Sequence, residues 1–295
     1  MKPEDFDAWA SLELAAVESA LDSLVPEDTP AGLGDAMRYA VLDGGKRLRP
    51  LLVLAGCDAV SGHPAAAMRA AVAVELIHAY SLVHDDMPCM DDDALRRGKP
   101  TVHIRYGEAQ AMLAGDAMQA LAFEVLTPEE GVPPALQARL VGLLARAAGH
   151  EGMAGGQAID LASVGRSLDE SALRDMHRRK TGALLQASVL MGAACGPVDA
   201  AAWSALSTYG AAIGLAFQVV DDILDVTQAS ETLGKTAGKD LENNKPTYVT
   251  VLGLSAARQH ADDLRDQALE ALARSGLSQA SRLAWLADKV VDRHH

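Results

Sequence analysis

The sequence predicts an all-α fold: a single domain of roughly ten or more helices around a deep central cavity. Residues that favour helices packed on helices dominate the composition, because Ala and Leu are abundant, the hydrophobic fraction is 49% and aromatic residues make up only 4%. Alternating β-branched runs bounded by turn residues do not occur, so a sheet is not expected. Short Pro and Gly breaks separate the expected helices. None is long enough for an interdomain linker, so residues 1–295 are expected to form one domain.

The expected helices follow one another between these breaks. A Gly pair at 44–45 ends one helix, and Pro50 begins the next. Met153 is interpreted as a core residue, and the segment Gly155-Gly156-Gln157 as a break between helices. Neither is placed in a site. The breaks lie near residues 26–30, 44–45, 62–64, 98–100, 127–134, 165 and 196–197.

Charge and cysteine content limit the classes of partner. The formal net charge of −14 makes nucleic acid or an anionic membrane a poor partner. The three cysteines are an odd number without metal-ligand spacing, which favours a reducing, cytoplasmic location. The N-terminus lacks the apolar core of a signal peptide, and no segment is expected to span a membrane. The terminal residues 293–295 carry no weight in the prediction.

Two aspartate clusters, each entered by an apolar helical run, are the most informative feature. The first spans residues 85–93, and the second contains Asp221, Asp222 and Asp225 at positions i, i+1 and i+4, where i and i+4 share a helix face. Solvated loops or helix N-caps would explain one such cluster alone. An acidic face within an apolar helix is better explained by a divalent cation, and magnesium suits sparse carboxylates that share it with phosphate oxygens.

Basic residues gather at the helix breaks, and two of the four groups directly follow the aspartate clusters. Solvated surface is the alternative for any single group. Arg forks match phosphate bidentately and Lys serves as a mobile point charge, so the pattern predicts a diphosphate between magnesium and basic side chains. The groups are Lys46, Arg47 and Arg49; Arg96, Arg97 and Lys99; Arg178, Arg179 and Lys180; and Lys235, Lys239 and Lys245.

With these motifs in order, the chain resembles the trans-polyprenyl diphosphate synthases, and most closely the bacterial farnesyl diphosphate synthases. The resemblance runs from about Leu33 to the C-terminus, and both aspartate clusters together with the basic motifs make it specific. It implies an isoprenoid-synthase-type helical bundle and a homodimer. The segments that carry it are GGKRLRP at 44–50, HAYSLVHDD at 78–86, LRRGKPT at 95–101, KTGALL at 180–185, FQVVDDILD at 217–225, LGK at 233–235 and NKPTY at 244–248.

The resemblance assigns roles to particular residues. It implies three magnesium ions per site, bound by Asp85, Asp91, Asp221 and Asp225, with Asp86 and Asp222 supporting them. An allylic diphosphate would be held by Arg96, Lys180, Lys235 and Lys245. The second substrate, isopentenyl diphosphate, would be held without metal by Lys46, Arg49, His78 and Arg97. Thr181 and Gln218 would line the path of the developing carbocation.

These roles imply head-to-tail prenyl transfer that ends at the fifteen-carbon farnesyl diphosphate. Cations stabilise the leaving diphosphate, and a dry apolar cavity protects the carbocation from water. The polar stretch 231–246 suits a lid over the phosphates. Tyr80, five positions before Asp85 on one helix, is expected to be the floor that limits chain growth, with Ser81 beside it too small for that role.

Three alternatives remain. A twenty-carbon geranylgeranyl synthase is favoured by the sequence Met87-Pro88-Cys89-Met90 inside the first cluster. A regulatory subunit of a hetero-oligomer is disfavoured because both clusters are intact. A terpene cyclase is disfavoured by Lys46, Arg47 and Arg49, which suit a second diphosphate that a cyclase lacks.

Overall fold

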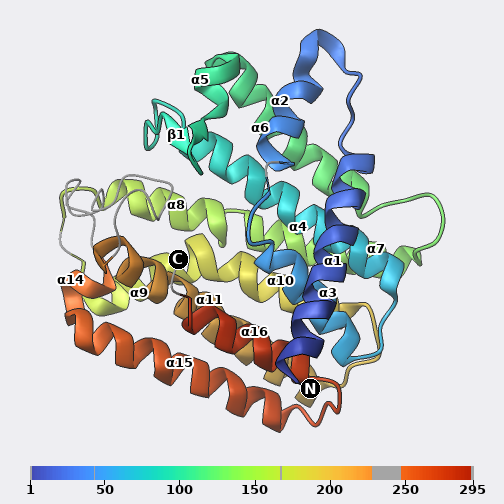
Figure 1. Ribbon diagram of the computed structural model, residues 1–295, viewed down its shortest axis with the longest axis vertical. Coiled ribbons are helices and arrows are strands. Elements are labelled where there is room, and N and C mark those ends of the chain that lie inside the picture. Colours follow the sequence, from blue (N-terminus) through green and yellow to red (C-terminus); the bar gives the residue numbers. More distant parts are fainter. Residues whose placement is uncertain (1, 43, 167, 228–246, 294–295) are drawn as a thin grey trace.

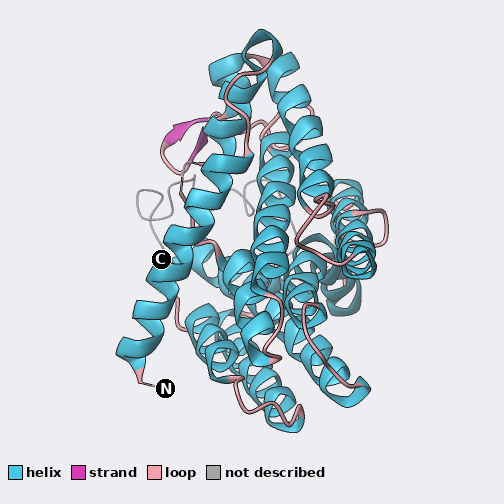
Figure 2. Ribbon diagram, turned by 90° about the vertical axis from the view of Figure 1, so that its right-hand side faces the viewer, coloured by secondary structure: helices cyan, strands magenta, loops and turns pink. Residues whose placement is uncertain are grey.

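The computed structural model describes residues 2–42, 44–166, 168–227 and 247–293, and these ranges are almost entirely helical (Figures 1 and 2). The predicted all-α fold is confirmed. In chain order the elements are α1 (Pro3–Leu24), a 3-10 turn η1 (Pro30–Gly32), α2 (Leu33–Val41), α3 (Leu48–Ala59), α4 (Pro64–Asp85), β1 (Leu95–Arg96), β2 (Lys99–Pro100), α5 (Val102–Tyr106), α6 (Glu108–Val125), α7 (Pro134–Ala148), α8 (Met153–Ala162), α9 (Glu170–His177), a π-helix η2 (Arg178–Gly182), α10 (Ala183–Ala194), α11 (Ala200–Thr227), α14 (Tyr248–Leu252), α15 (Leu254–Arg274) and α16 (Ser281–Val291).

Helices α3, α4, α10 and α11 form the centre of the bundle, with α6, α7, α15 and α16 packed around them (Figure 1). Glycine allows the closest of these approaches. A Cβ at Gly192 of α10 would lie 2.1 Å from the Val53 carbonyl oxygen of α3, and one at Gly56 would lie 2.8 Å from the Val189 carbonyl oxygen. The backbones of α3 and α10 therefore pack without intervening side chains.

Both aspartate clusters lie at helix C-termini, where the helix dipole disfavours negative charge. The α4 helix begins with Pro64 in its first turn and a His63 side chain that accepts from the Ala66 N–H at 3.3 Å, and it ends at Asp85. Asp225 lies two residues before the end of α11. Because like charges at a C-terminus stabilise neither helix, their placement indicates a bound cation rather than a role in folding.

Two short elements differ from the expected pattern of plain α-helices. Residues 95–100 form a two-stranded antiparallel hairpin, in which Arg97 and Gly98 both have positive φ, 54° and 77°. Two consecutive residues with positive φ form a turn whose twist matches that of the two paired strands in a tight hairpin. The η2 turn continues α9 into α10 with π-type geometry, a form that is common at functional sites.

Two helices, α4 and α11, are long and apolar enough to cross a membrane, so the expectation that no segment reaches that length is wrong. The tested window is 72% buried in α4 and 44% buried in α11. A buried core helix passes the same test, so length and composition are weak evidence for a membrane span here.

Candidate active site

One cavity of about 440 Å³ brings the two aspartate clusters together. Asp85 at the end of α4 and Asp221 of α11 both line it, although 135 residues separate them along the chain. The lining contains nine of the side chains that the sequence predicts for the site: Arg49, His78, Tyr80, Ser81, Asp85, Lys180, Thr181, Gln218 and Asp221. The remaining lining residues are Leu82, His84, Met90, Met153, Ala154, Gln157, Ala158, Leu161 and Phe217.

Asp85 is in an environment that disfavours its negative charge. The pKa of its carboxyl is raised to about 6, chiefly by burial; the charge of Lys180 opposes this rise, and the nearby Asp91 charge contributes to it. The loop after α4 folds back so that the Asp91 N–H donates to the Asp85 carbonyl at 2.9 Å. A cation between these two carboxylates would stabilise both.

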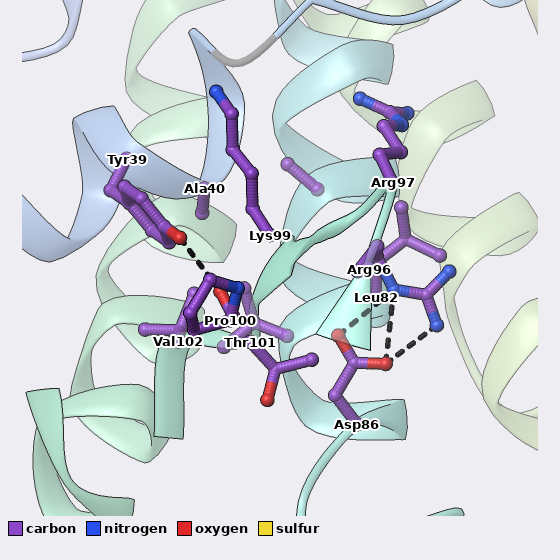
Figure 3. A pocket seen from close by; sticks show the side chains of 12 residues that line it. Tyr39, Ala40, Leu82, Asp86, Arg96, Arg97, Lys99, Pro100, Thr101 and Val102 are labelled. Atoms are coloured by element: carbon purple, nitrogen blue, oxygen red, sulfur yellow. Dashed lines mark hydrogen bonds and ion pairs between the residues drawn. The ribbon is translucent and has the colours of Figure 1, made fainter. Parts of the chain in front are cut away.

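Asp86 faces away from that pair, toward the hairpin. The Arg96 guanidinium donates to both oxygens of its carboxylate, through Nε and Nη2, with donor–acceptor distances of 2.6 to 3.0 Å (Figure 3). Arg96 and Arg97 line a separate small pocket of about 40 Å³. Asp86 and the predicted diphosphate ligand Arg96 therefore partner each other, beside the main cavity.

Arg293, which the sequence analysis left out, contacts the second cluster. Its Nη2 lies 2.9 Å from Asp221 Oδ1 and donates to the Phe217 carbonyl at 2.9 Å, and its guanidinium lies 4.0 Å from the centroid of the Phe217 ring. The residue follows α16, which returns the chain to α11 and α3. No local pattern in the sequence signals this contact, because it depends on how the last helix packs.

A chain of hydrogen bonds fixes the polar residues behind Asp221. The Thr181 hydroxyl donates to Gln218 Oε1 at 2.8 Å, and Gln218 Nε2 donates to Asp222 Oδ1 at 2.9 Å. The other Asp222 oxygen accepts from the Tyr248 N–H at 2.8 Å. Asp222 therefore orients Gln218 and Thr181, which both line the cavity. Asp225 lies one turn further along α11 and is buried.

The predicted second diphosphate site is strongly basic. Arg49 lines the cavity, is buried, and has an Nε without a hydrogen-bond partner among the described residues. Burial lowers the pKa of His78 well below its ordinary value, and the positive charges of Arg49 and Arg97 lower it further. Burial and the charge of Arg293 lower the pKa of Lys46. An anion placed here would accept a hydrogen bond from Arg49 Nε and would be attracted by the positive charges of Arg49 and Lys46. With its lowered pKa, His78 is neutral near pH 7 and can serve there as a hydrogen-bond donor.

Arg47 does not share this role, although it lies between Lys46 and Arg49. Its side chain is 2% exposed and is bonded to Glu75 of α4 at 2.7 Å and to Glu18 of α1 at 2.6 Å. Its backbone is left-handed, with φ 45°. This buried network anchors the basic loop to α4 and α1.

Lys180 reaches the cavity from η2, and its Nζ lies 2.5 Å from Asp160 Oδ2 of α8. Asp160 was not predicted, because a single acid on a helix gives no sequence signal. Lys235, Lys245 and the expected lid at 231–246 lie outside the described residues.

Magnesium was tested against this set of donors. In the part of the chain that the structure describes, no group of three or more His, Cys, Asp or Glu side chains converges as a closed metal site. Magnesium is commonly held by one or two carboxylates, with phosphate oxygens and water completing its shell. Asp85 and Asp221, which both line the cavity, fit that mode of binding. Asp91 does not line the cavity, but its N–H donates to the Asp85 carbonyl and its charge acts on Asp85.

An apolar cavity is lined by carboxylates from two helices and by a buried guanidinium whose Nε has no hydrogen-bond partner among the described residues. Such a cavity suits a diphosphate and the cations that bind it. The chain matches the Polyprenyl synthetase family over residues 30–285 and belongs to that family of prenyltransferases.

Plant geranylgeranyl pyrophosphate synthases are similar to nearly the whole chain. One of them, the heterodimeric geranylgeranyl pyrophosphate synthase large subunit 1 of Arabidopsis thaliana chloroplasts, is 45% identical over 99% of this chain and 80% of its own length.

Two solved structures extend the comparison. An FPP/GFPP synthase from Zymomonas mobilis has a TM-score of 0.86 and 40% identity, covering 97% of this chain and 99% of its own. The geranyltransferase of Helicobacter pylori, in complex with magnesium and isoprenyl diphosphate, has a TM-score of 0.86 and 34% identity, covering 99% of this chain and 97% of its own.

Proposed function

We propose that this enzyme condenses isopentenyl diphosphate with allylic diphosphates in a magnesium-dependent reaction and extends the chain to the twenty-carbon geranylgeranyl diphosphate. The observation that carries the reaction is that Asp85 and Asp221 line one cavity together with Arg49, whose buried Nε has no hydrogen-bond partner among the described residues. The twenty-carbon product is supported by the plant relatives, which are named as geranylgeranyl synthases.

Each end of the cavity supplies a different part of the chemistry. Asp85, Asp91 and Asp221 would hold magnesium, which neutralises charge on the leaving diphosphate. Lys180, fixed by Asp160, lies where it can contact the same diphosphate. Arg49, His78 and Lys46 hold the second diphosphate, so that its alkene faces the allylic carbon.

The cavity walls protect the carbocation that forms when the allylic C–O bond breaks. Met153, Ala158 and Leu161 line one side, and they exclude the water that would quench the cation to an alcohol. Thr181 and Gln218 place oxygen dipoles beside this path, in orientations fixed by Asp222. Preorganised dipoles of this kind stabilise charge that develops in the transition state.

A fifteen-carbon farnesyl product is the second candidate, and Tyr80 favours it. The Tyr80 side chain lines the cavity, is 8% exposed and stacks edge-on against His84 with 5.7 Å between the ring centroids. A rigid aromatic pair in the wall would limit the growth of the chain. The solved structure named as an FPP/GFPP synthase fits this candidate as well.

One assay separates the candidates. The protein is incubated with magnesium, isopentenyl diphosphate and, in turn, dimethylallyl, geranyl and farnesyl diphosphate, and the hydrolysed products are identified by chain length. Conversion of farnesyl diphosphate to the twenty-carbon product supports the leading proposal. Accumulation of the fifteen-carbon product from geranyl diphosphate, with no use of farnesyl diphosphate, supports the second. Absence of condensation with every starter would refute both.

We also propose a homodimer and a cytoplasmic location. The dimer is supported by exposed apolar side chains on two helices that pack together, Ile104 on α5 and Met112 and Leu113 on α6. The location is supported by three cysteines that are all free thiols.

A further inference from the structure

One face of α8 forms a wall of the cavity, and a single polar side chain interrupts it. The face consists of Met153, Ala154, Gln157, Ala158 and Leu161, which are spaced as one side of a helix. The other four side chains are apolar, so a glutamine among them requires an explanation.

The Gln157 carboxamide has no hydrogen-bond partner in the part of the chain that the structure describes. Both Oε1 and Nε2 are buried, and neither bonds any described residue. Two other glutamines of the core are satisfied: Gln218 bonds Thr181 and Asp222, and Gln186 Nε2 donates to the carbonyl and hydroxyl of Ser207 at 3.0 and 2.9 Å. A buried polar atom without a partner loses its hydrogen bonds to water on folding, so Gln157 lowers the stability of the protein without ligands.

The neighbouring glycine places this carboxamide next to the reacting groups. A Cβ at Gly156 would lie 2.1 Å from the Lys180 backbone nitrogen, so α8 and η2 are in direct backbone contact there. From the next turn of α8, Asp160 bonds the Lys180 side chain at 2.5 Å. Gln157 therefore lies between two contacts that fix α8 against Lys180, on the wall that it shares with Thr181.

We propose that Gln157 is a further substrate-contacting residue, whose carboxamide binds the reacting end of the allylic diphosphate. This inference rests on the proposed function. The amide N–H donates to an oxygen of the leaving diphosphate, and the amide oxygen faces the allylic carbon.

The chemical step that Gln157 assists is balanced without any proton transfer by the amide. The allylic C–O bond breaks and its electron pair leaves with the diphosphate. The alkene of isopentenyl diphosphate forms the new C–C bond, and the proton lost from the product cation goes to the departed diphosphate. During bond breaking, positive charge grows on carbon and negative charge on oxygen. A fixed amide dipole with its oxygen toward carbon and its N–H toward the leaving oxygen stabilises both charges.

The test combines stability with kinetics in Gln157→Met, which keeps the length of the side chain and removes both polar atoms. We expect the melting temperature of the protein without substrates to be equal to or higher than that of the wild type. We expect kcat at saturating substrates to fall on the order of 100-fold, the effect typical of removing one preorganised donor. The KM for isopentenyl diphosphate is expected to stay within about twofold, because Arg49 and His78 hold that substrate.

Gln186→Met is the matched control, since Gln186 lies on α10 outside the cavity lining and its amide is satisfied. It should lower the melting temperature and leave kcat unchanged, the reverse of Gln157→Met. An unchanged kcat in a stable Gln157→Met enzyme would overturn the inference. A melting temperature well below that of the wild type, or a failure to fold, would also overturn it, because the amide would then have partners in the fold. A wild-type enzyme without prenyl transfer would instead refute the proposed function.

Discussion

At the level of single residues, the site contains charges that the fold alone would not favour. Asp85 is the clearest case, because burial raises the pKa of its carboxyl to about 6 from an ordinary value of 3.8. A folded-state pKa above the unfolded value means that the native protein binds more protons between those two pH values. Stability therefore falls as the pH rises through this window, and the ionised carboxylate destabilises the ligand-free fold above it.

The Asp85→Asn variant tests this conflict between stability and function. Without metal, we expect it to be more stable than the wild type at pH 7, and the difference should disappear below pH 3.8, where the wild-type carboxyl is protonated in both states. With magnesium and both substrates, turnover should fall by on the order of 100-fold or more. Urea unfolding at several pH values and a product assay measure the two effects. Wild-type turnover in Asp85→Asn would refute its role in metal binding.

Arg47 shows the opposite situation, a charge that the fold needs. Arg47→Met would leave Glu75, whose side chain is 4% exposed, without its guanidinium partner. Loss of one partner from a buried ion pair costs about 3–5 kcal/mol, so we expect the free energy of unfolding to fall by about that amount. The double variant Arg47→Met/Glu75→Gln should recover part of the loss, because it removes the unpaired charge. A loss below about 1 kcal/mol, the value of an exposed pair, would contradict this role.

The basic loop also marks a limit of prediction from sequence. Lys46, Arg47 and Arg49 look equivalent along the chain, and the sequence predicts that Lys46 and Arg49 face a ligand only through resemblance to a family. The left-handed conformation of Arg47, φ 45°, directs its side chain into the contacts with Glu18 and Glu75. A non-glycine residue in that conformation cannot be anticipated from helix periodicity.

At the level of elements, the two helices that end in aspartates were predictable and the α8 wall was not. Apolar runs that enter paired carboxylates give α4 and α11 a signal both in periodicity and in charge. In α8, the only sequence signal is Gly155, Gly156 and Gln157, and these residues are equally typical of a break between helices. Its contribution arises because Gly156 lets α8 touch η2, a contact between segments that are distant in sequence. The hairpin at 95–100 was missed for a related reason, since each strand has only two residues.

We expect the α4 wall to limit the length of the product, and Tyr80→Ala tests this expectation. Tyr80 lies five residues before Asp85, about 7.5 Å along the helix axis from the end that anchors the diphosphate. Removing the ring opens the wall between α4 and α6, so the products should be at least one five-carbon unit longer than those of the wild type. Tyr80→Phe is the control, because it keeps the ring and should keep the product length. Chromatography of the hydrolysed products measures both. Unchanged products from an active Tyr80→Ala enzyme would exclude Tyr80 as the floor.

At the level of the whole molecule, the two ends of the chain complete the structure from one side. Phe6 of α1 stacks on Trp285 of α16 with 5.9 Å between the ring centroids, and Arg293 after α16 reaches Asp221, which lines the cavity. The first and last helices both contact α3. That residues 1–295 form a single domain stays a prediction.

The opposite side of the molecule carries the proposed dimer interface on α5 and α6. The buried face of α6 supports α4: a Cβ at Gly115 would lie 2.1 Å from the His84 ring, and His84 Nε2 lies 3.1 Å from the Met112 carbonyl oxygen. The other face exposes Leu113, 54% accessible, close in sequence to Met112, 40% accessible. A second copy that covers this face would therefore stabilise the helix behind the cavity wall.

The Leu113→Glu variant tests this interface by placing a charge within the apolar surface. We expect light scattering to give twice the chain mass for the wild type and the mass of one chain for Leu113→Glu, because an unpaired charge is costly in a buried interface. Leu12→Glu is the matched control, since Leu12 is 69% exposed on α1, away from the α5–α6 surface, and should leave the dimer intact. A monomeric wild type at micromolar concentration would refute the homodimer. A dimer that persists in Leu113→Glu would place the interface elsewhere on the molecule.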